Sequence, residues 1–308
     1  MALVTRRAFL TGASGVALGT LGLGSYAFAV EPGFLLTLTR YAPALPRWPV
    51  GQRLKIAVIA DIHACEPWMP AARIRHIADF TNTLQPDLIV ILGDYVAGHN
   101  VVTGPVLPEA WGEALSVLQA PLGVYAILGN HDWWHGPLMT LPGDGGKSVR
   151  LGLKRANIQV LENDAIRLAN AQGRAFWLLG LSDQLAFVHH HAKGGRIGAD
   201  DLPGTLAKVK DEAPIILLAH EPRIFPHVPE QVALTLCGHT HGGQVNVPGL
   251  TQSFVATAGA DSRYIYGHIV EGNKHLIISA GLGTSIMPVR FMRPPEVVEI
   301  NLGETDAA

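Results

Sequence analysis

The sequence predicts an α/β protein in which two mixed β-sheets pack as a sandwich with flanking helices. In the first half of the chain, apolar strand-like runs alternate with amphipathic helical segments, a pattern typical of a parallel sheet covered by helices. In the second half, short β-branched and apolar runs predominate. We therefore expect a second sheet that packs against the first.

Composition indicates an ordinary globular protein. The chain has 308 residues, of which 48% are hydrophobic and 16% charged, so it can bury one large core or two modest ones. The formal net charge of -2 provides no basic surface for nucleic acid, and no run of like charges suggests an interaction tail. We expect a monomer that does not bind nucleic acid.

The amino terminus has the features of an export signal. The pair Arg6-Arg7 precedes a charge-free, mildly apolar stretch over residues 11–30, and Ala27-Phe28-Ala29 provides a small-x-small cleavage site. Residues 1–29 therefore predict a twin-arginine-type signal peptide, which the twin-arginine machinery would export to the periplasm or cell envelope. The alternative is an uncleaved anchor associated with the membrane, although the glycines leave this segment poorly apolar for a span.

After the signal, Phe34–Tyr41 alternates apolar residues with threonine, as an edge strand does, and prolines then break the chain. We interpret residues 30–52 as a peripheral strand and turn joined to the main domain, 53–303, with a tail at 304–308.

The next segments predict a βαβ unit. Leu54–Ala60 and Leu88–Leu92 are continuous apolar runs that indicate buried strands. Between them, Ala71–Leu84 places its apolar side chains on one helical face, and Pro86 ends the helix. The remaining elements follow from the same signals. The expected helices are Pro108–Leu118, Ser148–Arg155 and Leu202–Lys210, and the expected strands are Val124–Leu128, Ile166–Ala169, Ala175–Leu179, Ile215–Ala219, Val232–Leu236, Tyr264–Val270, Leu276–Ser279 and Val297–Ile300.

Metal-ligating residue types follow five of these strands. They are Asp61 and His63, Asp94, Asn130, His220, and the pair His239 and His241. In α/β sheets ligands gather at the carboxyl ends of the strands, so these side chains should converge. A lone Asp at a strand end is more often a cap and a lone His more often a satisfied structural residue, but five such segments in one chain favour a metal site. One tetrahedral zinc needs about four ligands, whereas two ions that share a bridging carboxylate use all seven.

Taken together, Asp61-x-His63, Gly93-Asp94, Gly129-Asn130-His131-Asp132, His220 and Gly238-His239-x-His241 resemble the motif series of the calcineurin-like metallophosphoesterases. Three later segments, Gly281-Leu282-Gly283-Thr284, Pro288-x-Arg290-Phe291 and Pro294-Pro295-Glu296, further resemble an exported bacterial phosphodiesterase branch of that family.

The resemblance implies two divalent transition-metal ions and a set of ligands for each of them. The first ion would take Asp61, His63, Asp94 and His241. The second would take Asp94, Asn130, His220 and His239, with Asp94 as the bridge. Mixed nitrogen and oxygen donors suit manganese, iron or zinc.

The resemblance also implies a catalytic role for His131, which would face the substrate and protonate the leaving group or stabilise charge there. The nucleophile would be a hydroxide held by the two metals. The related protein Ser/Thr phosphatases carry Asp-Arg where this chain has Ala97-Gly98, so a protein phosphatase is not expected.

We therefore expect a dinuclear phosphoester hydrolase, most simply a phosphodiesterase or pyrophosphatase that acts outside the cytoplasm on a small-molecule or lipid-linked phosphoester. A UDP-diacylglucosamine-type pyrophosphatase is a more specific alternative. Two opposing classes are a non-catalytic, metal-stabilised interaction scaffold of the same fold and a di-iron redox protein, which would lack its usual cysteine cluster here.

Four further features have two interpretations each. Cys65 and Cys237 are either small buried hydrophobes or a bridge or metal contact. Trp133-Trp134 either forms an apolar wall for substrate or packs against the scaffold. Arg290 contacts either the substrate phosphate or a structural carboxylate, and the histidines 189–191 lie either in a polar loop or at an auxiliary site.

Overall fold

The computed structural model describes residues 14, 19–136, 138–139, 143–187, 197–248, 251 and 261–303. The strands are β1 (Thr37–Tyr41), β2 (Leu54–Ile59), β3 (Cys65–Glu66), β4 (Leu88–Ile91), β5 (Gly104–Pro105), β6 (Val124–Ala126), β7 (Gln159–Val160), β8 (Asp164–Ala169), β9 (Ala175–Gly180), β10 (Ile215–Leu218), β11 (Val232–Cys237), β12 (Gly267–Glu271), β13 (Lys274–Ile278) and β14 (Glu296–Leu302). The helical elements are η1 (Tyr26–Val30), α2 (Glu31–Phe34), α3 (Ala71–Thr83), α4 (Pro108–Leu115), α5 (Asn130–Trp134), α6 (Lys147–Arg155), α7 (Leu202–Leu206), η3 (Pro222–His227) and η4 (His241–Gly243).

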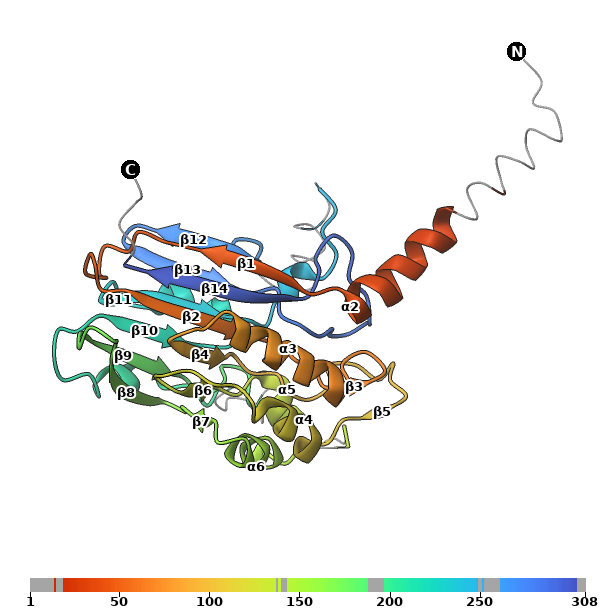
Figure 1. The fold of residues 1–308 in the computed structure, drawn as a ribbon, viewed down its shortest axis with the longest axis horizontal. Coiled ribbons are helices and arrows are strands. Elements are labelled where there is room, and N and C mark those ends of the chain that lie inside the picture. Colours follow the sequence, from red (N-terminus) through yellow and green to blue (C-terminus); the bar gives the residue numbers. More distant parts are fainter. Residues whose placement is uncertain are drawn as a thin grey trace, which may run out of the picture.

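Two six-stranded mixed sheets form the centre of the molecule, as the sequence predicts (Figure 1). The first has the order β1-β14-β2-β4-β6-β7, in which β2, β4, β6 and β7 are parallel and β14 is antiparallel to β2. The second has the order β12-β13-β11-β10-β9-β8, with a parallel centre and antiparallel edge strands. The carboxyl ends of the parallel strands from both sheets provide the loops that carry the candidate site.

The strands are buried on both faces, which explains their continuous apolar sequences. Along β2, Ile56 and Val58 face a core between the two sheets, whereas Ala57 and Ile59 face a second core beneath α3, α4 and α6. A third core lies on the far side of the second sheet, where Phe225 of η3 and Leu202 of α7 cover β10. The layers are therefore helix, sheet, sheet and helix.

Three local differences from the expected elements have physical reasons. Helix α7 ends at Leu206 rather than Lys210, because the amides of Lys208 and Val209 bond to carbonyls three residues back and tighten the chain. Strand β12 begins at Gly267, because a turn binds the Tyr264 amide to the Asp261 carbonyl. The two-residue strands β3 and β5 are too short to produce a periodic signal.

The amino-terminal helical segment projects from the body and is tied to it at its carboxyl end (Figure 1). The buried carboxylate of Glu31 accepts hydrogen bonds from the Met292 and Arg293 amides, and the Ala27 carbonyl accepts one from the Arg290 amide. Among the described residues, every helix is too short or too polar to cross a bilayer.

Candidate dinuclear metal centre

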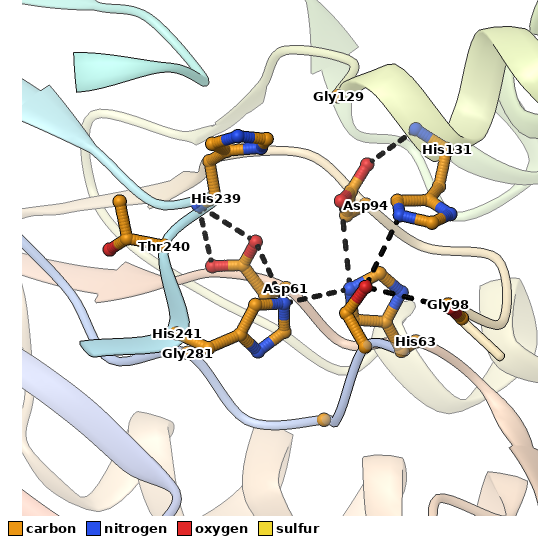
Figure 2. Close-up of polar contacts among 12 residues, drawn as sticks. Asp61, His63, Asp94, Gly98, Gly129, His131, His239, Thr240, His241 and Gly281 are labelled. Carbon is orange, nitrogen blue, oxygen red and sulfur yellow. Dashed lines mark hydrogen bonds and ion pairs between the residues drawn. The ribbon is translucent and has the colours of Figure 1, made fainter. Parts of the chain in front are cut away.

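The structure brings all seven sequence-predicted ligands together at the strand ends. Figure 2 shows Asp61, His63, Asp94, His239 and His241 among them. Asp61 and His63 follow β2, Asp94 follows β4, and Asn130 opens α5 after β6. His220 follows β10, and His239 and His241 follow β11. The first sheet thus supplies the oxygen donors and one histidine, and the second sheet supplies the other three histidines.

The first cluster consists of Asp61, His63 and His241, all of which are buried. The Nε2 atoms of His63 and His241 lie 3.1 Å apart, and the two rings stack with centroids 4.9 Å apart. The Nε2 of His241 is 3.9 Å from Oδ1 of Asp61, and the Nε2 of His63 is 3.5 Å from Oδ2 of Asp94. Three donor atoms therefore lie within 4.8 Å of one another, and Asp94 stands beside His63 as a possible fourth ligand of a tetrahedral shell.

The second cluster consists of Asp94, His220 and His239. Oδ1 of Asn130 joins it, because this oxygen lies 3.1 Å from Nε2 of His220 and 3.0 Å from Nδ1 of His239. Oδ2 of Asp94 is 3.2 Å from Nε2 of His220, so the same oxygen approaches a histidine of each cluster. Asp94 thus occupies the position that a bridging carboxylate would need.

Backbone carbonyls set the orientation of two ligand rings. Nδ1 of His63 donates to the Val96 carbonyl over 2.8 Å, and Nδ1 of His220 donates to the Leu92 carbonyl over 2.6 Å. Each bond keeps a proton on Nδ1, so Nε2 is the nitrogen that faces the centre and that would bind a metal ion when it is unprotonated. This is the tautomer that a metal-binding histidine requires.

The electrostatics of the centre also suit cations. Burial lowers the pKa of His63 to about 4 and lowers the pKa values of His239 and His241, so these rings are neutral near pH 7. Burial raises the pKa of Asp61 to about 7. For His220, burial again acts to lower the pKa, but the charge and hydrogen bond of Asp94, together with the charges of Asp61 and Glu221, outweigh burial and raise the pKa. Bound cations would favour ionised carboxylates and neutral histidines throughout.

The ligand backbone is unusual. Asp61, His63, Asp94, His239 and His241 all have positive φ values between 47° and 72°, a region that non-glycine residues seldom occupy. Each of these residues therefore turns the chain sharply just after its strand.

Glycines pack against the ligand side chains. A Cβ at Gly98 would lie 2.9 Å from the His63 ring, a Cβ at Gly281 would lie 2.6 Å from Cβ of Asp61, and a Cβ at Gly129 would overlap Oδ1 of Asp94 (Figure 2). The absence of side chains at these positions is what gives the ligands their space.

Asp132 is a positioning residue that the sequence reasoning did not assign. Its buried carboxylate accepts hydrogen bonds from the amides of Asp94, Tyr95 and Gly129 at 2.8–2.9 Å. It therefore joins the loop that carries Asp94 to the loop that carries Asn130. The sequence feature that could have identified Asp132 is its place in the Gly-Asn-His-Asp motif. An acidic residue in the first turn of a short helix can accept hydrogen bonds from the amides of neighbouring loops.

His131 lies beside the centre and outside both ligand clusters. Its amide donates to Oδ1 of Asp94 over 2.9 Å, its Nε2 lies 3.4 Å from the Ser285 hydroxyl, and its ring is 5.1 Å from that of His63. Burial lowers the pKa of His131 to about 3. A neutral ring retains one N–H, which can donate a hydrogen bond to developing charge.

A cleft of about 520 Å³ opens next to the centre. His131, Asn130, His239 and His241 line its inner end, so a bound molecule would reach the donor atoms directly. The two tryptophans have different surroundings. Trp134 lines the cleft, whereas Trp133 packs against the scaffold, with Cζ of Arg150 4.9 Å from the centroid of its ring.

Both cysteines are free and buried, which confirms the interpretation of small hydrophobes and makes a bridge between Cys65 and Cys237 wrong. For Arg290, the expected structural carboxylate is wrong, because among the described residues its guanidinium forms no ion pair, whereas contact with a substrate phosphate stays a prediction. Its buried guanidinium donates to the carbonyls of Ala280, Gly281, Gly283 and Arg293, because burial makes backbone acceptors the nearest available partners. The histidines 189–191 lie outside the described residues.

The model of the calcineurin-like phosphoesterase family matches residues 54–271, and the chain belongs to this family. It is therefore a metal-dependent phosphoric ester hydrolase, and the expected fold class is confirmed.

Curated relatives extend over nearly the whole chain. An uncharacterized metallophosphoesterase of Aquifex aeolicus is 29% identical and covers 91% of this chain and 96% of the relative. The uncharacterized metallophosphoesterase YkuE of Bacillus subtilis is 29% identical over 98% of this chain and 99% of the relative. The phosphodiesterase YaeI of Escherichia coli is 30% identical over 97% of this chain and 100% of the relative.

Proposed function

We propose that this protein hydrolyses phosphodiester or pyrophosphate bonds with two divalent transition-metal ions, outside the cytoplasm. The observation that carries the proposal is the pair of donor clusters that meet at Asp94. Two ions there would supply an activated water and neutralise phosphoryl charge. Histidine-rich donor sets favour manganese, iron or zinc over magnesium or calcium.

The roles of the surrounding residues follow from their positions. Asp132 and the Leu92 and Val96 carbonyls hold the ligands in place before substrate arrives. His131 borders both the centre and the cleft, so its N–H can donate to the leaving-group oxygen as negative charge develops there.

A diester fits the cleft better than a monoester. A phosphomonoester carries up to two negative charges on its phosphorus group near neutral pH, whereas a diester, or each phosphorus group of a UDP-sugar pyrophosphate, carries one. Among the described residues that line the cleft there is no lysine or arginine, and the nearby Arg290 already donates to backbone carbonyls. The relative YaeI is named a phosphodiesterase, which supports the same substrate class.

Hydrolysis also accounts for more of the site than the opposing classes do. A metal-stabilised scaffold would need neither a histidine beside the ions nor a cleft that leads to them. A di-iron redox protein would need a path for electrons, whereas both cysteines are buried and free. The proposed location outside the cytoplasm rests on Arg6-Arg7 and the apolar stretch that follows them.

The test compares three substrates at equal concentration: 4-nitrophenyl phosphate, bis(4-nitrophenyl) phosphate and a UDP-sugar. Each is assayed with the metal-free protein and after addition of manganese, iron(II) or zinc. We expect turnover only with metal, and a higher kcat/KM for the diester or the pyrophosphate than for the monoester. Metal-independent turnover, or a preference for the monoester, would contradict the proposal.

A further inference from the structure

We propose that the cleft beside the metal centre holds a long hydrocarbon chain, so that the substrate is an amphiphilic phosphoester. This inference rests on the proposed function, because it names the substrate class of the same site. It depends on three observations: the apolar lining of the cleft, the internal use of its polar groups, and an apolar residue held in a strained conformation at its rim.

The outer part of the cleft is lined mainly by apolar side chains. These belong to Trp134, Val245, Ile286, Met287 and Val289. Ile286 and Met287 are 78% and 45% exposed, so the lining continues to the protein surface. The cleft volume of about 520 Å³ is within the usual range for ligand sites. The long, flexible side chain of Met287 can adapt to hydrocarbon chains of different shapes.

The polar side chains of the outer cleft are occupied by bonds within the protein. The Thr240 hydroxyl donates to the Ile265 carbonyl. The Gln244 amide donates to the Met287 carbonyl and accepts from the Ser285 amide. A nucleobase or sugar needs donors and acceptors that are free to bind its edges, and leaving polar groups unpaired costs affinity. A hydrocarbon has no such requirement.

Ile286 has a φ of 67°, which is an outlier for a β-branched side chain. Its amide donates to the Gly98 carbonyl, and Ser285 pairs with Gly98 in an isolated bridge, so the loop is held in this conformation next to His63. An exposed isoleucine in a strained backbone gives the folded protein no evident stability, which favours a role in binding.

The chain would lie on the leaving-group side of the phosphorus. His131 and Ser285 line the cleft between the metal centre and the apolar walls, and His131 is the residue that we assign to the leaving-group oxygen. A phosphoryl group at the metals therefore places an attached alkyl oxygen next to His131 and its hydrocarbon chain against Met287 and Val289.

The test measures binding of ethyl, butyl, octyl and dodecyl phosphate to the metal-loaded protein by calorimetry, below the micelle concentration. Burial of methylene groups should lower Kd by at least about tenfold between butyl and dodecyl phosphate. Because calorimetry needs no turnover, failure of this inference and failure of the proposed hydrolysis are separate outcomes.

Dodecyl phosphate in phosphatidylcholine vesicles, compared with the free amphiphile, shows whether the chain is taken from a bilayer or from solution, and either result agrees with the proposal.

The key variant is Ile286→Asn combined with Met287→Gln. Asparagine tolerates a positive φ, so the replacement relieves strain and should not lower Tm. The variant should lose most of the dependence of Kd on chain length and keep its affinity for ethyl phosphate. Val270→Thr is the control, because Val270 is 51% exposed on β12 and lies outside the cleft lining. A Kd independent of chain length in the wild type, tighter binding of uridine monophosphate than of dodecyl phosphate, or an equal loss in the control would overturn the proposal.

Discussion

The Nε2 atoms of His63 and His241 face each other at 3.1 Å, although the two residues are 178 positions apart in the chain. The Nδ1 of His63 is already bonded to a carbonyl, and burial lowers the pKa of both rings. Without metal, the pair can share one proton, with Nε2–H of His241 donating to Nε2 of His63, because the Arg290 guanidinium lies 3.4 Å from Nδ1 of His241 and can only donate. A cation that displaced this proton would be held by both nitrogens. Together with Asp61, the two rings form the first candidate metal position.

Asp94→Asn should lose most of both metal ions, because one oxygen of Asp94 approaches a histidine of each cluster. Elemental analysis of the purified protein should give close to two ions per chain for the wild type. Asp79→Asn, which changes an exposed carboxylate in a helical ion pair, should keep both. Full metal content in Asp94→Asn, or one ion in a fully active wild type, would contradict the dinuclear assignment.

Affinity for the second ion should fall as the pH is lowered. The pKa of His220 is raised by Asp94, so the metal-free ring holds a proton that a metal must displace. Below this raised pKa, each pH unit should weaken binding by up to about tenfold, and binding should release protons. Calorimetry in buffers of different ionisation enthalpy measures that release. Uptake of protons, or affinity independent of pH between 5 and 8, would show that the ring is already neutral.

His131→Asn should lower turnover by about 10²- to 10⁴-fold and leave metal content near that of the wild type. The loss should be smallest for a nitrophenyl ester, whose stable leaving group hardly needs a hydrogen bond from the neutral ring, and largest for an alkyl ester. Because the pKa of His131 is lowered to about 3, its cationic form is already absent above pH 5, and kcat/KM should show no loss near pH 6.5 from this ring. Equal slowing of all esters would instead place His131 on the phosphoryl group or the water.

Gly98→Ala should weaken binding at the first metal position, because the added Cβ would lie 2.9 Å from the His63 ring and 3.0 Å from Cα of Ser285. We expect at least a tenfold rise in Kd for that ion, with little change in the fold. Gly104→Ala is a matched control, since a Cβ there would meet no atom within 4 Å. If both variants bind metal like the wild type, the glycine contact does not set the position of His63.

Replacement of Arg6 and Arg7 by lysines should retain the precursor in the cytoplasm, because the twin-arginine machinery reads the arginine pair. Cell fractionation with an antibody against the mature domain measures the distribution. A variant with lysine in place of Arg53, which lies outside the predicted signal, is the control. Unchanged export of the double variant would indicate a different route.

The architecture and the convergence of the candidate ligands could be predicted because they depend on local patterns. A buried parallel strand such as β4 is a continuous apolar run, and the polar residue at its end, Asp94, marks the carboxyl edge where the sheet gathers ligands. The convergence of Asp61 and His241 from different sheets needed more than a pattern, and the motif series supplied it.

Features that depend on side-chain packing could not be predicted. Neighbouring residues Trp133 and Trp134 have the same sequence signal but point to different environments, because the first turn of α5 directs one to Arg150 and the other to the cleft. Arg290 looks like a phosphate ligand in the sequence, and only the folded loop shows that backbone carbonyls surround it. In the same way, only the folded structure shows that the polar side chains of the outer cleft, Thr240 and Gln244, form hydrogen bonds within the protein.

The left-handed backbone at five ligand residues restricts how the metal preference of this enzyme can be redesigned. Exchange of a histidine for cysteine or glutamate would normally shift a site towards softer or harder ions. At His63, His239 or His241 the new side chain would also have to tolerate a φ near +50° to +70°, which few residues other than glycine, asparagine and aspartate do readily. Selection for a new metal would therefore first have to remodel the loops, and the ligands would change afterwards.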